Sequence, residues 1–368
     1  MGSIQKQRRL GGLLVNGGLL LLILVWTIPT FGLFVSSFRT REDIQTSGWW
    51  NIFPHREWQV VRVIDPKTEG LDATGPMVIE GSNPLLFEEL REGVELPNGM
   101  RLTWVGNRRL GRIEVQEQVW TVSWDFTLAN YQQVLNGKDF EYQRPDGTVE
   151  VIPGDDFVSA FLNSLAVAVP ATVIPILVAA FAAYGFAWMR FPGRRLLFIM
   201  VVALLVVPLQ LALVPILRDF RALEINGTFL AMWLAHTGFG LPLATYLLFN
   251  YISSLPRETL ESAFIDGASH FTVFRRLILP LSVPALASFA IFQFLWVWND
   301  YLVALIFLGG NPETKVITQR LADIVGSRGN DWHLLTAGAF VTMLLPLLVF
   351  FGLQRFFVRG LLAGSVKG

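Results

Sequence analysis

The residue types that usually carry out enzymatic chemistry occur in this sequence, but their spacing predicts no catalytic or metal site. The chain has no cysteine, which excludes disulfides, thiolate zinc sites and cysteine nucleophiles. The four histidines, His55, His236, His270 and His333, lack the spacing of metal ligands, and no Ser/His/Asp arrangement is indicated. No G-x-x-x-x-G-K-(S/T) loop occurs, so no phosphate cradle is recognisable. We therefore expect no enzymatic activity, no metal and no cofactor in this chain.

The segment 257–280 has a pattern suited to mechanical rather than chemical work. Leu260, Ala263 and Phe264 share one face of a first short helix. Gly267 then permits a sharp change of direction, because glycine tolerates positive φ. In a second short helix, residues at helical spacing are Phe271, Phe274, Leu277 and Ile278, and Pro280 is expected to end it. We call residues 257–280 the hook; a stiff bend of this kind suits force transmission between a soluble partner and membrane helices.

Two polar residues, Asn299 and Asp300, lie within an apolar run. Ionisable residues inside membranes usually face the bundle interior or a water-filled path. The two residues are therefore candidates for a translocation path, and a structural hydrogen bond to a neighbouring helix is the alternative interpretation.

The elements that must position these residues are predicted to be membrane helices. The chain of 368 residues is 52% hydrophobic and only 16% charged, whereas soluble domains carry about 25% charged residues. A spanning helix needs about 20 apolar residues. Six stretches qualify, and we expect them to be helical: 13–37, 160–188, 196–216, 228–251, 282–308 and 334–357. The first run is too long for a cleavable signal and predicts a retained anchor.

The distribution of Lys and Arg predicts the orientation of these spans. One side of the membrane receives Lys6, Arg8, Arg9, Arg190, Arg194, Arg195, Arg257, Arg275, Arg276, Arg355, Arg359 and Lys367. The short loops of the other side hold Arg218, Arg221, Lys315, Arg320 and Arg328. The richer side belongs in the cytoplasm. Both the N-terminal stretch 1–12 and the tail 358–368 are therefore expected inside the cell, as is the loop 252–281, which contains the hook.

The segment 38–159 is the one sizeable piece outside the predicted spans, and it is expected to be a β-rich exported domain. Trp58–Val63 and Ile113–Val115 mix apolar and polar residues at roughly strand spacing. The dipeptides Asn98-Gly99 and Asp146-Gly147 lie between such runs and favour tight hairpin turns. The predicted fold is thus an all-α polytopic membrane protein of six helices with a small β-rich insert.

Three motifs resemble a known family, the permease subunits of ABC importers. Glu261-Ser262-Ala263, then Gly267, then Ile278-x-Pro280 resemble the loop signature of these permeases, with Ser262 where Ala is usual. The segment Trp298–Tyr301 resembles a motif of carbohydrate permeases, and the tail from Gly360 resembles the end of the smaller membrane subunit of maltose-type importers. The resemblance covers roughly residues 10–38 and 125–368, and the insert between them is more like the α-glucoside branch.

This resemblance implies partners and residue roles. The partners would be a second permease subunit, a cytoplasmic ATPase dimer that holds ATP and Mg, and an extracytoplasmic sugar-binding protein, in the bacterial cytoplasmic (inner) membrane. The hook would dock into the ATPase, with Glu261 making a charge contact and Phe271 or Phe274 burying an apolar anchor. The tail residues expected at the ATPase dimer interface are Ser365, Val366, Lys367 and Gly368.

The same resemblance implies an α-glucoside substrate such as maltose, trehalose or glucosylglycerol. The formal net charge of zero gives no reason to expect nucleic acid as a partner. Two other functions remain as alternatives at this point. One is a membrane-anchored ligand sensor, and the other is a secondary transporter driven by an ion gradient.

Overall fold

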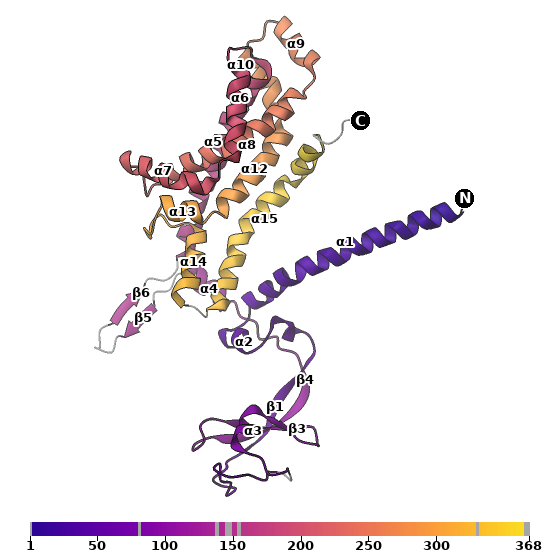
Figure 1. Ribbon diagram of the computed structural model, residues 1–368, viewed down its shortest axis with the longest axis vertical. Coiled ribbons are helices and arrows are strands. Elements are labelled where there is room, and N and C mark those ends of the chain that lie inside the picture. Colours follow the sequence, from indigo (N-terminus) through magenta and orange to yellow (C-terminus); the bar gives the residue numbers. More distant parts are fainter. Residues whose placement is uncertain are drawn as a thin grey trace. The chain divides into compact units, whose positions relative to one another are not determined.

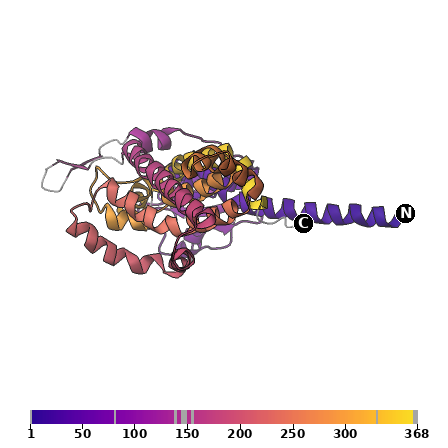
Figure 2. The same cartoon turned by 90° about the horizontal axis from the view of Figure 1, so that it is seen from above.

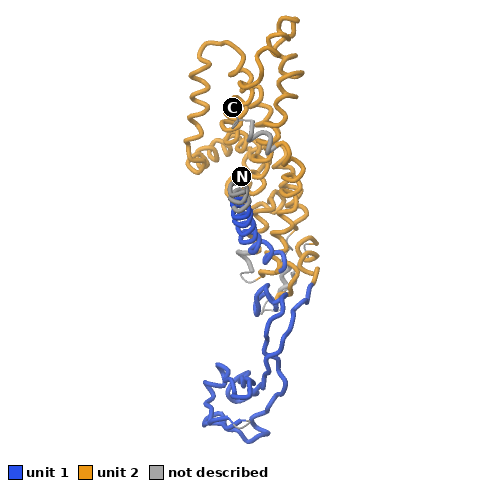
Figure 3. The backbone as a smooth tube through the Cα atoms, turned by 90° about the vertical axis from the view of Figure 1, so that its right-hand side faces the viewer, with its two compact units in different colours: residues 1–35, 42–126 blue, residues 36–41, 127–368 orange. Residues whose placement is uncertain are grey.

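The computed structural model describes the backbone of residues 2–79, 82–136, 140–143, 149–152, 156–328 and 331–363. Within these ranges, the structure describes the backbone alone for residues 2–10, 140–143, 149–152, 325–328 and 357–363. The chain forms two compact units, coloured separately in Figure 3. The first comprises Met1–Val35 and Glu42–Phe126, and the second comprises Ser36–Arg41 and Thr127–Gly368.

The first unit combines a long apolar helix with a small antiparallel sheet (Figure 1). The sheet has the order β1-β4-β3-β2. Its elements and their neighbours are α1 (Gly2–Ser37), α2 (Arg41–Thr46), η1 (Trp49–Ile52), β1 (His55–Ile64), α3 (Phe87–Glu92), β2 (Val94–Glu95), β3 (Met100–Val105) and β4 (Arg112–Thr121). Side chains of Leu90, Leu102 and Ile113 form the centre of its buried core. The predicted β-rich character of the insert is therefore confirmed for these strands.

The first predicted hairpin is confirmed in atomic detail. Asn98-Gly99 joins β2 to β3, Gly99 has φ +84°, and the Asn98 side-chain oxygen accepts a hydrogen bond from the Met100 N–H at 3.1 Å. Phe140–Gln143 and Val149–Ile152 form a second antiparallel pair, β5 and β6, in the second unit. The predicted turn between them, Asp146-Gly147, lies outside the described residues.

The second unit is a helical bundle in which α5 packs against α8 and α12, and α12 packs against α15. Figure 2 shows the chain from above. Asp156 caps the N-terminus of α5 by accepting a hydrogen bond from the Ser159 N–H at 2.9 Å. The helices are α4 (Ala129–Asn136), α5 (Phe157–Trp188), α6 (Arg194–Ala203), η2 (Leu204–Val206), α7 (Leu209–Ala222), α8 (Phe229–Ser253), α9 (Arg257–Ile265), α10 (His270–Val273), η3 (Phe274–Ile278), α11 (Leu279–Leu281), α12 (Val283–Trp298), α13 (Leu302–Phe307), α14 (Ile317–Arg328) and α15 (Trp332–Ala363).

Among the described residues, three helices are long and apolar enough to cross a membrane: Gly11–Ser37, Phe157–Trp188 and Trp332–Phe356. Two bent helix pairs, α6–η2 with α7 and α10–α11 with α12, raise this number to five if each pair forms one span. The helix α8, at 25 residues, is not among them. The structure thus contains several candidate spans, and the number six stays a prediction.

The predicted span 196–216 is not one continuous helix. The chain turns by 104° between η2 and α7. Pro208 stands at the start of α7 with φ −63°, a position where its missing N–H removes no helical hydrogen bond. The same proline could not continue the preceding helix without losing a bond, which explains why the helix breaks here.

Candidate functional site

The hook has the predicted bend at Gly267. Helix α9 ends at Ile265, and Gly267 follows with φ +82°. The Ala268 N–H donates to the Ala263 carbonyl and the Gly267 N–H to the Phe264 carbonyl, both at 3.0 Å. These two bonds form a Schellman cap, which requires a left-handed residue at the glycine position. Ser269 then caps α10 by accepting a hydrogen bond from the Thr272 N–H at 3.2 Å.

The prediction that Pro280 ends the second helix of the hook is wrong. From α10 the helix continues through a π-helical turn, Phe274–Ile278, and then through α11 to Leu281. Pro280 lies in the first turn of α11, directly after the π turn, so the helix departs from regular α geometry at the place where the proline cannot donate a bond. The change of direction comes two residues later, at Ser282, where the chain bends by 70° into α12.

The predicted contact residues of the hook divide into an exposed and a buried set. Glu261, Ser262 and Gly267 are exposed, as is Phe271 at 63%. In contrast, Phe274 is 3% exposed and stacks on Phe181 with ring centroids 4.3 Å apart. Ile278 is also fully buried, Ala263 is half-buried and Pro280 is exposed. Of the two phenylalanines, only Phe271 is therefore available to a partner, and Phe274 belongs to the core of this chain.

This division predicts opposite results for two alanine substitutions. Phe274→Ala is expected to destabilise the fold by about 3–5 kcal/mol, the usual effect of removing a buried phenyl ring. Phe271→Ala is expected to leave the fold intact, because its ring is exposed, and to weaken the binding of a partner at the hook. Thermal unfolding of the purified protein in detergent and co-purification of the partner measure the two effects. Loss of stability in Phe271→Ala would contradict the assignment.

Asn299 and Asp300 lie where the predicted span 282–308 breaks into α12 and α13. The Asn299 side chain is exposed and donates to the Leu295 carbonyl at 2.7 Å. The Asp300 carboxylate accepts a hydrogen bond from the Val303 N–H at 2.9 Å and so caps α13. Its other oxygen lies 4.0 Å from Nε2 of the buried His236. Both residues therefore have a structural role at helix ends, and a translocation role remains a proposal. The predicted tail residues 365–368 lie outside the described residues.

Three side chains, Trp233, Gln293 and Trp298, donate hydrogen bonds between helices to carbonyls that prolines leave without a partner. The sequence analysis did not predict these bonds. A proline provides no N–H for the carbonyl four residues before it. Pro170, Pro175 and Pro346 therefore release the carbonyls of Ala166, Ala171 and Thr342. Each of these carbonyls accepts a hydrogen bond from another helix: Trp233 Nε1 to Ala166 at 2.9 Å, Gln293 Nε2 to Ala171 at 3.1 Å and Trp298 Nε1 to Thr342 at 3.0 Å. Membrane proteins tolerate helical prolines where neighbouring helices satisfy the released groups.

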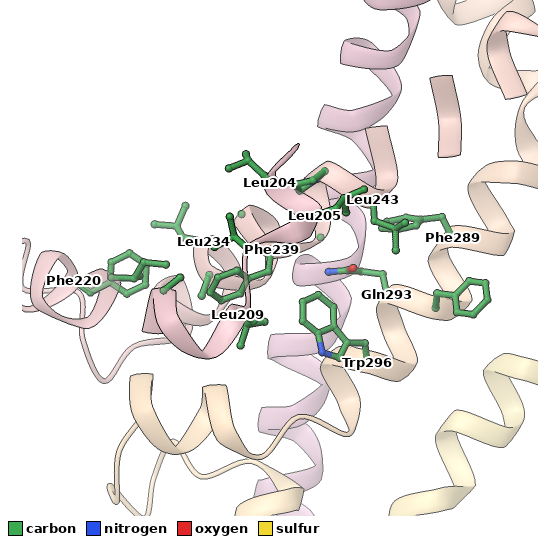
Figure 4. Close-up of a pocket in the computed structure, with 18 residues that line it drawn as sticks. Leu204, Leu205, Leu209, Phe220, Leu234, Phe239, Leu243, Phe289, Gln293 and Trp296 are labelled. Atoms are coloured by element: carbon green, nitrogen blue, oxygen red, sulfur yellow. The ribbon is translucent and has the colours of Figure 1, made fainter. Parts of the chain in front are cut away.

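A pocket of about 720 Å³ opens among η2, α7, α8 and α12. Figure 4 shows that the Gln293 and Trp296 side chains reach it from α12, opposite Leu204, Leu205 and Leu209. Its walls are mainly aliphatic and aromatic, and no charged side chain lines it among the described residues. None of the predicted site residues borders this pocket. The signal that could have indicated Gln293 is an amide within an apolar helix, which must find hydrogen-bond partners.

Comparison with known proteins shows which family the chain resembles. Residues 160–362 match the binding-protein-dependent transport system inner membrane component. Over 353 residues the chain is 47% identical to the osmoprotective compounds uptake permease protein GgtD of Synechocystis sp., covering 96% of this chain and 91% of the relative. It is 46% identical over 385 residues to the alpha-glucoside transport system permease protein AglG of Rhizobium meliloti, covering 96% and 97%. A probable ABC transporter permease of Pyrococcus horikoshii is 42% identical over 241 residues, covering 66% of this chain and 82% of the relative.

Among solved structures, a bacterial ABC transporter involved in the import of the acidic polysaccharide alginate has a similar fold. The TM-score is 0.51 at 18% sequence identity, over 64% of this chain and 81% of the other. This likeness supports the permease fold of the helical unit. The predicted relation to ABC importer permeases, which are not themselves enzymes, is confirmed by these matches. The chain belongs to the family of inner membrane components of binding-protein-dependent transport systems.

Proposed function

We propose that this chain forms half of the translocation path of an ATP-driven importer for an α-glucoside or a related small sugar. The observation that carries the proposal is the end-to-end similarity to two permeases named for osmoprotective compounds and alpha-glucosides. The match to those two includes the insert, since it covers 96% of this chain. The Pyrococcus relative covers only 66%, so the full-length similarity favours the α-glucoside branch.

In the proposed transporter, a second permease subunit completes the path and an extracytoplasmic binding protein delivers the sugar. An ATPase dimer, which holds ATP and Mg, engages the exposed surface of the hook. Closure of that dimer would move the hook, and α12 would move with it because the two are joined at Ser282. ATP hydrolysis on the partner would supply the energy, and nucleotide would shift the equilibrium between the two conformations because it favours one of them. Both termini lie in the cytoplasm in this arrangement, as the Lys and Arg distribution predicts.

The hook favours this function over a ligand sensor or an ion-driven transporter. Its exposed residues include Phe271 and the nearby Ile265, two large apolar side chains on a segment otherwise rich in polar groups. Exposed apolar groups rimmed by polar residues mark protein interaction sites. A partner that binds there and moves would act directly on the helices that border the pocket.

Reconstitution of the complete transporter in liposomes tests the proposal. With ATP enclosed and the cognate binding protein outside, radiolabelled maltose or trehalose is expected to accumulate, while the β-linked cellobiose is not. Accumulation without ATP, driven instead by a sodium or proton gradient, would show that the chain is not part of an ATP-driven importer.

A further inference from the structure

The proline-released carbonyl of α8, which borders the pocket, has no side-chain donor among the described residues. Pro242 lies inside α8 and cannot donate to the carbonyl of Gly238, four residues earlier. The corresponding carbonyls at Ala166, Ala171 and Thr342 each have a donor from a neighbouring helix. Gly238 and Pro242 both line the pocket of about 720 Å³. The Gly238 carbonyl is thus an acceptor that a ligand in this pocket could use.

Gln293 supplies a second acceptor with a fixed direction. Its side chain is 2% exposed, and its Nε2 donates to the carbonyls of Ala171 and His236 at 3.1 and 3.2 Å. Since both neighbours are carbonyls, the nitrogen must face them, and Oε1 is left to accept. Gly240 makes room for this amide, because a Cβ at that position would lie 2.5 Å from Oε1.

Trp296 supplies an aromatic face and a donor. Its ring borders the pocket in Figure 4 and meets the His236 ring edge-on, with centroids 5.3 Å apart. Its indole N–H makes no hydrogen bond within the described part of the chain. Trp side chains combine a large apolar surface with one polar edge, which suits ligands that have both.

We propose that this subunit contacts the transported sugar itself, at a subsite formed by the Gly238 carbonyl, Gln293 Oε1 and the Trp296 indole. The inference rests on the proposed function and names the part of the pocket that would recognise the sugar. A sugar presents hydroxyl groups at its edge and apolar C–H groups on its faces, which match two acceptors, one donor and aromatic walls. The volume is within the range of about 300–1,000 Å³ typical of small-molecule pockets. The uncharged lining suits a neutral ligand; an acyl chain would fill the walls but leave both acceptors unpaired.

The proline that creates the first acceptor provides the test. Pro242→Ala restores an N–H to α8, which then bonds the Gly238 carbonyl within the helix. In reconstituted transporter, we expect this variant to raise the KM for maltose roughly five- to tenfold, the effect of one lost hydrogen bond. The matched control is Pro170→Ala, whose released carbonyl is already taken by Trp233, and its KM is expected to be unchanged.

A second pair of variants tests the contribution of the Trp296 ring to sugar binding. Trp296→Leu is expected to raise the KM more than Trp296→Phe, which keeps the aromatic face and loses only the N–H. If wild-type transporter accumulates maltose with ATP while Pro242→Ala and Trp296→Leu leave the KM unchanged, the subsite is disproved and the proposed function stands. If the wild type accumulates no α-glucoside, the proposed function itself fails.

A separate observation in the first unit concerns its aromatic residues. Trp49 packs on the last turns of α1, with its ring centroid 5.8 Å from that of Phe31. Gly32 permits this approach, since a Cβ there would lie 2.5 Å from Trp49 Nε1. The apolar part of α1, Gly11–Ser37, has 27 residues and is therefore about 40 Å long. Phe31 and Gly32 lie about 8 Å from its end, near the boundary of a hydrocarbon core about 30 Å thick.

Next to Trp49, several large aromatic side chains are exposed rather than buried. Trp50 is 60% and Trp124 69% exposed, although Trp124 is held by its N–H, which donates to the Ile52 carbonyl at 2.8 Å. Phe53 and Trp120 are exposed as well, and the guanidinium of Arg56 lies 5.3 Å from the centroid of the Trp120 ring. We call these four residues, Trp50, Phe53, Trp120 and Trp124, the aromatic girdle.

We infer that the aromatic girdle lies in the membrane–water interface at the C-terminal end of α1 and binds phospholipid there. The girdle is continuous, through the ring contacts of Trp49 with Phe31, Trp50 and Phe53, with the exposed apolar surface of α1, which lipid would cover if α1 spans the membrane. Trp and Tyr are enriched at this depth because one edge of each ring is polar, and Arg extends its charge toward the headgroups. The sheet would thus be anchored at its base, while its far end projects into water.

Spin labels on single cysteines test the depth of the girdle, since the chain has no cysteine of its own. The variants are Trp50→Cys and Trp124→Cys, in intact transporter in phospholipid nanodiscs. Leu110→Cys is the matched control, because Leu110 is apolar and 76% exposed but lies beyond the ten-residue strand β4, about 30 Å from the base of the sheet. We expect the girdle labels to collide with oxygen several-fold more than with a water-soluble nickel chelate, and the control to show the reverse.

Two results would overturn this inference. Labels at the girdle that are as accessible to nickel as the control would place it in water. Labels inaccessible to both reagents would place it against a protein partner. If a tryptophan variant fails to assemble, a spin label at Phe53→Cys measures the depth of the girdle instead, because the Phe53 ring is also exposed.

Discussion

Valine in place of Gly267 is expected to abolish sugar uptake by the proposed transporter while ATP hydrolysis continues. Gly267 has φ +82°, and a β-branched residue there is strained by about 1–3 kcal/mol. No atom lies within 4 Å of an added Cβ, so the strain comes from the backbone alone. The two bonds of the Schellman cap would open, and α9 would lose its fixed angle to α10. Uptake and hydrolysis measured on the same proteoliposomes separate coupling from catalysis.

Two further substitutions serve as controls for this prediction. Gly267→Asn is expected to retain most of the uptake, because asparagine tolerates the left-handed region better than other residues. Gly227→Val introduces the same strain at another glycine with φ +84° and free space around it, away from the hook. Full coupling in Gly267→Val, or equal uncoupling in Gly227→Val, would show that the bend of the hook does not transmit force.

Methionine in place of Gln293 is expected to destabilise the helical bundle by about 1–3 kcal/mol, the sum of two hydrogen bonds between membrane helices. Methionine has a similar volume and shape but cannot donate to the carbonyls of Ala171 and His236. The Ala171 carbonyl is affected most, because Pro175 denies it an N–H from its own helix. Thermal unfolding in detergent measures the loss.

A double-mutant cycle separates the loss of the Gln293 hydrogen bonds from a general packing defect. Pro175→Ala gives the Ala171 carbonyl an N–H within α5, so Gln293→Met is expected to destabilise that background less than it destabilises the wild type. The matched comparison is Pro170→Ala, which restores an N–H to a carbonyl that Gln293 does not contact. Identical effects of Gln293→Met in all three backgrounds would contradict the assignment.

Local features of the fold were predictable because they depend on neighbouring residues. The hook follows from Gly267 between two amphipathic turns, and the β2–β3 hairpin follows from Asn98-Gly99. The cap of α4 at Thr127, whose hydroxyl accepts from the Ala129 N–H at 3.1 Å, is local in the same sense. The helix breaks at Pro208 and at Asn299 were less accessible, because a membrane helix can continue past a proline or a polar residue as well as break there.

The pocket and the contacts at the prolines could not be predicted, because they depend on which helices adjoin. The sequence shows prolines in one apolar run and Trp or Gln in others, without saying which donor meets which carbonyl. The buried position of Phe274 has the same origin. Its partner Phe181 lies almost a hundred residues earlier in the chain, and periodicity gives Phe271 and Phe274 similar weight.

The bonds at the prolines have a consequence for the order in which the protein is made. Helix α5 is synthesised before α8 and α12, which contain the donors for its two released carbonyls. On leaving the ribosome, α5 therefore carries two main-chain acceptors that lipid cannot satisfy. Biogenesis would favour holding α5 beside the insertion machinery until Trp233, and later Gln293, emerges to release it into the bilayer.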